Sequence, residues 1–300
     1  MNKNLTNSER IEEWAREFLE RLNNKLKSNE KEVEIEMGSY RIGIRKYLVL
    51  KENLEKIVEF VKYLKISNRK LPTITVRARI LVYFAHVVKK PFKEVKKKDI
   101  ENFLEKYSSR SNNYILVLKT TIKPFFKWLY GYGKRDGYPE VVDWIDTGNK
   151  NTNYQKLPQV LTMEEINKMI EVCDNLRDKA LISILYESGC RASEILDLKI
   201  SDLVFDEYGG VLIVRGKTGA RRIRLISSIP ALREWLNVHP RKNDPNASLF
   251  CSLAKNNKGS PLDVCGLHFI VKEIAKKAGI NKRVYPHLFR HTRATHLAKY

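Results

Sequence analysis

The amino-acid sequence predicts a mainly α protein with one small antiparallel β-sheet. Apolar side chains recur at helical spacing along most of the chain, as in Ile11, Trp14 and Phe18. Segment 211–226 differs, because two runs rich in β-branched residues flank a turn that contains glycines, which is typical of a β-hairpin. The polar stretch 148–156 has no hydrophobic period and predicts a linker between two folded parts.

Composition indicates a nucleic-acid partner. The 300 residues include 56 Lys+Arg against 35 Asp+Glu, a net charge of +21, and a protein that binds a DNA backbone needs such an excess to displace counterions. A Lys/Glu-rich surface that serves heat tolerance would explain many of these charges but not so large an imbalance.

The 4 cysteines lack Cys-x-x-Cys spacing, which favours reduced thiols in a cytoplasmic protein. We expect no membrane span and no signal peptide.

The first half of the chain predicts helices in two groups. Residues 1–70 are expected to form an N-terminal helical extension or arm, in which segment 33–44 is ambiguous, and residues 71–147 a compact helical domain. Helices are expected at about 8–26, 52–64, 80–88, 99–104 and 113–129. Runs of lysine are more often a solvated face than a binding site, but some would contact phosphates. The candidate DNA-binding lysines here are Lys89, Lys90, Lys97 and Lys98.

A turn between two helices carries the first candidate site residue. The apolar stretch 180–186 predicts a buried helix, and Gly189 can end it in a left-handed conformation. A new helix then starts near residue 192, so Arg191 is expected at the junction. Glu194 lies one turn further on and can brace that arginine. The alternative is an ordinary surface salt bridge, which contributes little.

The hairpin carries the second set of candidates. Lys217 is expected at its tip, and Arg221 and Arg222 follow along the return strand. One interpretation is a basic hairpin that grips a nucleic-acid backbone. The other makes Lys217 a mobile general acid.

A predicted C-terminal helix carries the third set of candidate site residues. Pro286 favours the first helical position, and His287 and Arg290 then share one face near the helix N-terminus, where a phosphate binds well. His287 and His291 have the four-residue spacing of zinc-binding pairs. However, Leu288 stands where the metalloprotease motif requires Glu, and no third ligand is evident. With no P-loop either, we expect no metal and no cofactor.

Four motifs in this order resemble the catalytic domain of the tyrosine recombinases, the family of phage integrases and Xer-type resolvases. They are Thr-x-Glu-Glu at 162–165, Gly-x-Arg-x-Ser-Glu at 189–194, Gly-Lys-Thr-Gly at 216–219 and His-x-x-Arg-His at 287–291. The resemblance covers residues 157–300 and implies a mixed α+β catalytic domain there. It extends less specifically to residues 71–147, as the family's helical core-binding domain, which precedes the linker at 148–156.

The resemblance implies a site-specific recombinase that cuts and rejoins double-stranded DNA without metal or ATP. A tyrosine would attack the scissile phosphate and form a 3′-phosphotyrosyl bond. Arg191 and Arg290 would clamp that phosphate, Lys217 would protonate the leaving 5′-oxygen, and His287 would assist. The working assembly would be a homotetramer on two DNA sites.

One departure from the family pattern affects this expectation. In the family, further helices follow the His-x-x-Arg helix and carry the nucleophilic tyrosine, whereas this chain stops at Tyr300. We therefore expect the catalytic domain to be C-terminally incomplete and the nucleophile to be absent from residues 1–300. Two alternatives stay open: a non-catalytic DNA-binding remnant or split-recombinase fragment, and a nicking–closing enzyme similar to type IB topoisomerases.

Overall fold

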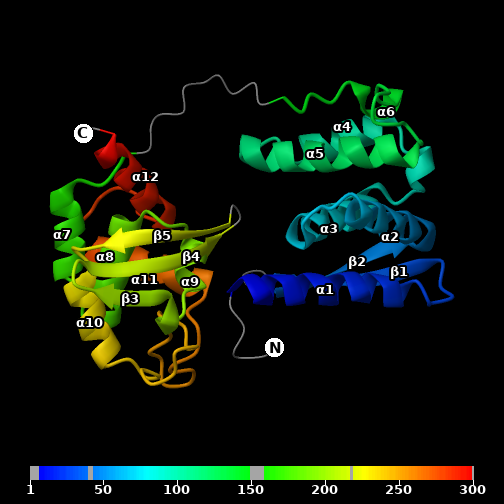
Figure 1. Cartoon of the computed structure of the whole chain (residues 1–300). Coiled ribbons are helices and arrows are strands. Elements are labelled where there is room, and N and C mark those ends of the chain that lie inside the picture. Colours follow the sequence, from blue (N-terminus) through cyan, green and yellow to red (C-terminus); the bar gives the residue numbers. More distant parts are fainter. Residues whose placement is uncertain (1–6, 40–42, 149–158, 217–218, 299–300) are drawn as a thin grey trace. The chain divides into compact units, whose positions relative to one another are not determined.

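A computed structural model describes residues 7–39, 43–148, 159–216 and 219–298. The chain divides into two compact units, Ile11–Asn153 and Tyr154–Tyr300, and the second also takes Met1–Arg10 (Figure 1). We call them the N-terminal unit and the C-terminal unit. Each has its own hydrophobic core. The mainly α prediction is confirmed, with two small antiparallel sheets in the described residues instead of the single one we expected.

The N-terminal unit consists of helices and one β-hairpin. In chain order its elements are α1 (Asn7–Lys25), β1 (Glu32–Ser39), β2 (Gly43–Leu50), α2 (Lys51–Ile66), α3 (Leu71–Val88), the 3₁₀ turn η1 (Phe92–Glu94), α4 (Lys97–Glu105), α5 (Asn112–Leu129) and α6 (Glu140–Asp143). The described residues of the ambiguous segment 33–44, namely 33–39 and 43–44, lie in β1 and β2, which pair from Glu32↔Leu50 to Ser39↔Gly43. Val33, Ile35 and Met37 alternate with glutamates and are buried, which is the period of a strand with one face in the core.

One hydrophobic core joins residues 11–70 to residues 71–147. Phe18 of α1 and Ile35 of β1 belong to the same buried cluster as Phe84 of α3 and Phe125 of α5. Figure 1 shows the hairpin between α1 and the pair α2–α3, with α4 and α5 beyond them. The first stretch, which we expected as an extension or arm, therefore packs against the second within one unit, because its apolar faces are covered there.

Helix α3 is long and apolar enough to cross a membrane by length and composition, whereas we expected no such segment. The helix contacts α2, α4, α5 and strand β2, and Ile74, Leu81 and Phe84 are buried among them. A helix in the centre of a folded unit is apolar for the same reason as a membrane span, since both are shielded from water.

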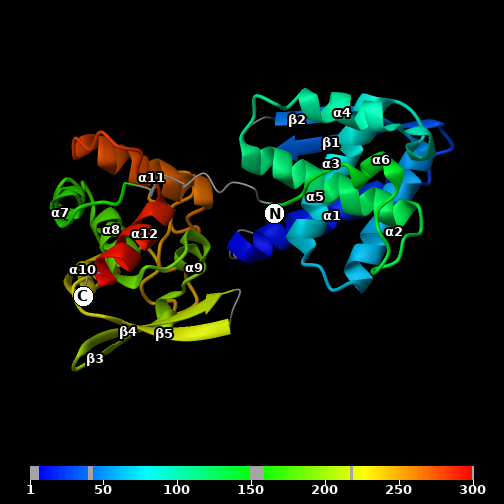
Figure 2. The ribbon, with the colours of Figure 1, turned by 90° about the horizontal axis from the view of Figure 1, so that it is seen from above.

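The C-terminal unit packs helices on one side of a small sheet. Its elements are α7 (Met163–Glu171), α8 (Leu176–Ser188), α9 (Ala192–Leu196), the 3₁₀ turn η2 (Ile200–Asp202), β3 (Leu203–Asp206), β4 (Gly209–Gly216), β5 (Gly219–Leu225), α10 (Ile229–Asn237), α11 (Val264–Lys277) and α12 (Pro286–Leu297). The antiparallel sheet has the order β3-β4-β5 and lies at one edge of the unit (Figure 2). All four cysteines lie in this unit as reduced thiols.

Helix α8 is the centre of the C-terminal unit. It contacts α7, α10, α12 and β5, and residues on several sides of it are fully buried, including Leu181, Ile182 and Leu185. A helix that is apolar all round must be covered on all sides. Its two ends are therefore held in place, and the C-terminal end leads directly into the Arg191 turn.

Phe84→Ala should destabilise the N-terminal unit by about 3–5 kcal/mol, the usual cost of removing a fully buried aromatic ring. The Phe84 ring contacts the rings of Phe92, Phe103 and Phe126, so three other elements lose a neighbour. Urea unfolding followed by far-ultraviolet circular dichroism measures the loss. Val76→Ala on the exposed side of the same helix is the control and should change stability little. Equal losses in both variants would contradict the assigned core.

Candidate active site

Arg191 lies at the turn between α8 and α9, as the sequence predicted. Gly189 ends α8 with φ +56°, a left-handed conformation that glycine adopts without strain. Arg191 is the N-cap of α9, and its backbone N–H donates to Oε2 of Glu194 at 2.8 Å. Its Nη1 donates to Oε1 of the same carboxylate at 2.9 Å. The predicted bracing of Arg191 by Glu194 is confirmed.

Helix α12 places Arg290 against the same turn. Pro286 is the first residue of α12, as expected, and Nη1 of Arg290 donates to the carbonyl oxygen of Gly189 at 2.7 Å. The carbonyl of the residue that ends α8 thus anchors one arginine, and the turn that follows it presents the other. Two guanidinium groups from distant parts of the sequence are thus held at one turn.

His287 lies one turn before Arg290 on α12. Desolvation lowers the pKa of His287, and the nearby His291, Arg290 and Arg191 lower it further. The ring centroids of His287 and His291 are 5.1 Å apart. A histidine with a lowered pKa stays neutral near pH 7, so beside the two arginines it can donate a hydrogen bond from one ring nitrogen and accept a proton at the other.

Glu194 is the buried partner of these cations. Its side chain is 3% exposed, and it accepts hydrogen bonds from Arg191 and from Arg221 on β5. Burial alone would raise the pKa of Glu194, but the hydrogen bonds from Arg221 and Arg191 outweigh it and lower the pKa to about 2. Glu194 is therefore ionised at neutral pH and offsets part of the local positive charge.

Sequence reasoning did not foresee the contact of Arg221 with Glu194; the expectation that Arg221 contacts DNA stays a prediction. Both terminal nitrogens of Arg221 donate to Glu194, Nη1 to Oε1 at 3.1 Å and Nη2 to Oε2 at 2.8 Å. Gly216 at the end of β4 packs against Glu194 so closely that a Cβ there would overlap Oε1. No signal in the sequence could have found this contact, because the burial of Glu194 is known only from the structure.

Two further contacts fix α12. The buried hydroxyl of Thr292 accepts a hydrogen bond from the backbone N–H of Leu161 at 3.0 Å. The Tyr186 hydroxyl on α8 lies 2.9 Å from Nδ1 of His296. Helix α12 is therefore attached both to the segment that enters the unit and to the central helix, which gives His287 and Arg290 a rigid base.

Lys217 lies outside the described residues, so its predicted position at the hairpin tip stays a prediction. The flanking strands are described: β4 ends at Gly216 and β5 begins at Gly219. Arg222 is exposed on β5 and pairs with Ile213 in the sheet, whereas Arg221 pairs with Val214. Neighbouring residues of a strand face opposite sides, so Arg222 faces away from Glu194.

The four candidate lysines of the N-terminal unit gather where α3, η1 and α4 follow one another. Lys89 is exposed and ends α3 with φ +51°. Each of the other three has an acidic neighbour. Nζ of Lys90 lies 2.9 Å from Oδ1 of Asp99, and Lys97 and Lys98 lie 4.0 and 3.8 Å from Glu101. Segment 89–101 has six lysines and three acids, so it stays positive despite these pairs.

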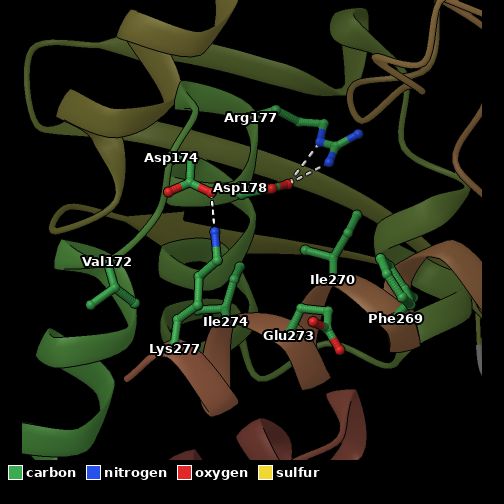
Figure 3. Close-up of a pocket in the computed structure, with 9 residues that line it drawn as sticks. All are labelled: Val172, Asp174, Arg177, Asp178, Phe269, Ile270, Glu273, Ile274 and Lys277. Carbon is green, nitrogen blue, oxygen red and sulfur yellow. Dashed lines mark hydrogen bonds and ion pairs between the residues drawn. The ribbon is translucent and has the colours of Figure 1, made fainter. Parts of the chain in front are cut away.

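A separate pocket of about 320 Å³ lies at the other end of α8 (Figure 3). Its charged groups are largely paired with each other, Lys277 with Asp174 and Arg177 with Asp178. It shares no residue with the Arg191–Arg290 turn. Within the described part of the chain, no three His, Cys, Asp or Glu side chains gather as a metal site.

Comparisons with known proteins identify the family of this chain. A model of the phage integrase family matches residues 159–300. Tyrosine recombinase XerA of Pyrococcus furiosus is 33% identical over 251 residues, which cover 81% of this chain and 80% of the relative. Tyrosine recombinase XerD of Listeria monocytogenes is 30% identical over 261 residues, with coverage of 80% and 84%.

Solved structures show the same fold. The XerH site-specific recombinase in a pre-cleavage complex with its difH substrate matches with a TM-score of 0.60 at 22% identity, over 98% of this chain and 86% of that one. A lambda integrase dimer bound to a core site matches with a TM-score of 0.62 at 16% identity, over 80% and 88%. By the sequence matches, this chain belongs to the phage integrase family of tyrosine recombinases.

The Glu194→Gln variant should be less stable than wild type at neutral pH. Its stability should also fall less than that of wild type when the pH is lowered. The folded pKa of about 2 lies below the ordinary value of 4.5. Ionised Glu194 therefore stabilises the fold fully above pH 4.5, and this contribution disappears as the pH falls toward 2. The variant should be less stable by about 2–3 kcal/mol at pH 7, and the difference should shrink below pH 4.5.

Denaturant unfolding at a series of pH values measures that difference. Glu234→Gln is the control, because Glu234 is exposed and its Lys179 partner lies 3.7 Å away. A wild-type advantage that stays constant down to pH 2.5 would show that Glu194 is not ionised by its partners as described.

Proposed function

We propose that this protein is a site-specific DNA recombinase that cuts and rejoins DNA through a 3′-phosphotyrosyl intermediate. The observation that carries the proposal is the convergence of Arg191, Arg290 and His287 on the turn at Gly189. Membership of the tyrosine recombinases supports it. Relatives of known structure are DNA-bound recombinases, which supports double-stranded DNA as the partner.

The arginines act on charge that develops during the reaction. When a tyrosine attacks a phosphodiester, the pentacoordinate transition state carries more negative charge on its non-bridging oxygens than the substrate does. Arg191 and Arg290 would donate to those oxygens, and because Glu194 and the Gly189 carbonyl hold them in place they need little reorganisation as the charge appears. Neutral His287 would add a donor or exchange a proton, and Lys217 would protonate the leaving 5′-oxygen.

The N-terminal unit would supply further phosphate contacts. Lys89, Lys90, Lys97 and Lys98, with Arg222 of the C-terminal unit, form our set of backbone-binding residues. Such contacts add affinity without reading sequence. We further propose the family's core-binding role for residues 71–147, a linker at 148–156, a homotetramer on two DNA sites, and a cytoplasmic location where the DNA substrate is.

Arg290→Ala should lower the rate of DNA cleavage by at least about 100-fold, the scale for one lost transition-state donor. The test uses a polypeptide in which a nucleophilic tyrosine follows residue 300, on a duplex selected from a randomised pool. Duplex affinity, measured by fluorescence anisotropy, should change little, because one contact is lost among many. A loss of affinity as large as the loss of rate would show that Arg290 contributes to DNA binding and not to stabilisation of the transition state.

Lys217→Ala is the matched comparison in the same assay. A 5′-bridging phosphorothiolate has a leaving group that needs no proton, so it should restore much of the cleavage lost in Lys217→Ala and none of that lost in Arg290→Ala. If the sulfur substrate restores neither variant, Lys217 is not the general acid.

Residues 1–300 alone should bind duplex DNA and form no covalent adduct, because positioned arginines cannot replace a nucleophile. A nicked suicide substrate tests this. The short strand released by cleavage diffuses away, so rejoining is prevented and any phosphotyrosyl complex remains, which a denaturing gel detects. An adduct that disappears in Tyr285→Phe or Tyr300→Phe would contradict our assignment of the active site.

A further inference from the structure

Arg221 contacts Cys190 and Glu194, one before and one after Arg191 in the sequence. Its fork binds the two oxygens of Glu194, and Nη2 also lies 3.5 Å from Sγ of the buried Cys190. Arg191 lies between these contacts in the sequence and shares Oε1 of Glu194 with Arg221. The two arginines are thus joined by one buried carboxylate, although they come from a helix N-terminus and a strand.

We propose that Arg221 is a positioning residue that keeps Arg191 available to a phosphate by occupying Glu194. This inference rests on the proposed function, because it concerns how Arg191 is prepared for a DNA phosphate. Among the residues that the structure describes, the Arg191 side chain makes one hydrogen bond, from Nη1, and it is 42% exposed. Its remaining donors have no recorded partner among the described residues, so they can bind an anion.

Competition for the carboxylate explains the effect. A carboxylate binds one guanidinium best through two parallel hydrogen bonds. Arg221 already donates to both oxygens, so Arg191 is limited to a side-on contact with Oε1. Without Arg221, Oε2 would keep only the backbone N–H of Arg191 as its hydrogen-bond donor. The Arg191 fork would then turn onto Glu194 and withdraw the donors that a phosphate needs.

Charge acts in the same direction. Two arginines around one carboxylate leave a net positive charge at the turn, whereas Arg191 and Glu194 alone would form a neutral pair. Gly216 prevents an alternative adjustment, because the end of β4 packs against Oε1 and leaves Glu194 no room to swing toward it. Arg221 is 35% exposed, but both ends of its fork are used internally, which distinguishes it from the exposed Arg222.

The experiment is a double-mutant cycle on residues 1–300 with inorganic phosphate as the probe. Binding is followed by NMR of the arginine Nε–H groups in wild type, Arg221→Ala, Arg191→Ala and the double variant. Arg221→Ala should weaken phosphate binding by about fivefold, within the usual range of coupling between contacting residues. In the Arg191→Ala background, the same change should weaken it by less than about twofold.

Two further variants complete the design. Arg241→Ala is the matched control, because Arg241 also pairs with a carboxylate, Asp244, at a similar exposure in the same unit; its phosphate affinity should equal that of wild type. Arg221→Lys keeps the charge beside Glu194 and serves if Arg221→Ala does not fold. It should still weaken binding, since a single ammonium cannot occupy both oxygens as a fork does, but less than the alanine variant does, because one cation stays on Glu194.

The outcomes separate the two proposals. Equal losses with and without Arg191 would show that Arg221 acts through its charge alone, and wild-type affinity in the folded Arg221 variants would show no role; either result overturns the inference. A protein that does not respond to phosphate, or an Arg191→Ala variant that binds it as wild type does, would instead contradict the proposed phosphate site.

Discussion

The carboxylate of Glu194 is the group on which the candidate active site depends. It is buried, it stays ionised, and it joins three segments: the turn after α8, the end of β4 and the strand β5. A buried charge is tolerated only when its partners surround it, and removal of one partner leaves the rest uncompensated. The position of Arg191 therefore depends on the position of the sheet, because both contact Glu194.

The cations of this protein fall into two kinds. Those that we assign to one phosphate are fixed from behind: Arg191 by Glu194, and Arg290 by the carbonyl of Gly189. Most of those that we assign to the DNA backbone are exposed and hold loose pairs, such as Lys98 at 3.8 Å from Glu101. Lys90, which lies 2.9 Å from Asp99, is the exception. The difference follows from the task, because transition-state stabilisation requires fixed donors whereas backbone binding requires only a field of positive charge.

Local features were predictable from the sequence. Gly189 as a helix end, Glu194 three residues after Arg191 and Pro286 as a helix start each depend on residues within one turn, and all three agree with the structure. The hairpin of β1 and β2 was missed because its glutamates obscured a clear alternation of apolar residues. Charged residues suppress a strand signal even when they only fill the exposed face.

Contacts between distant segments were not predictable. Arg221 and Glu194 are separated by 27 residues, and Thr292 and Leu161 by 131. Nothing local to Arg221 distinguishes it from Arg222, since both are basic residues on a strand. Only the sheet register and the position of α9 show that Arg221 faces Glu194 whereas Arg222 faces away from it.

The attachment of Leu161 to Thr292 has a mechanical consequence. The chain enters the described part of the C-terminal unit at residue 159, and its first fixed points are the Val160 carbonyl, bound by Lys282, and the Leu161 N–H, bound by Thr292. A pull on the preceding chain would therefore be resisted first by α12 and by the loop before it. Tension would reach the helix that carries His287 and Arg290 before it reached the hydrophobic core.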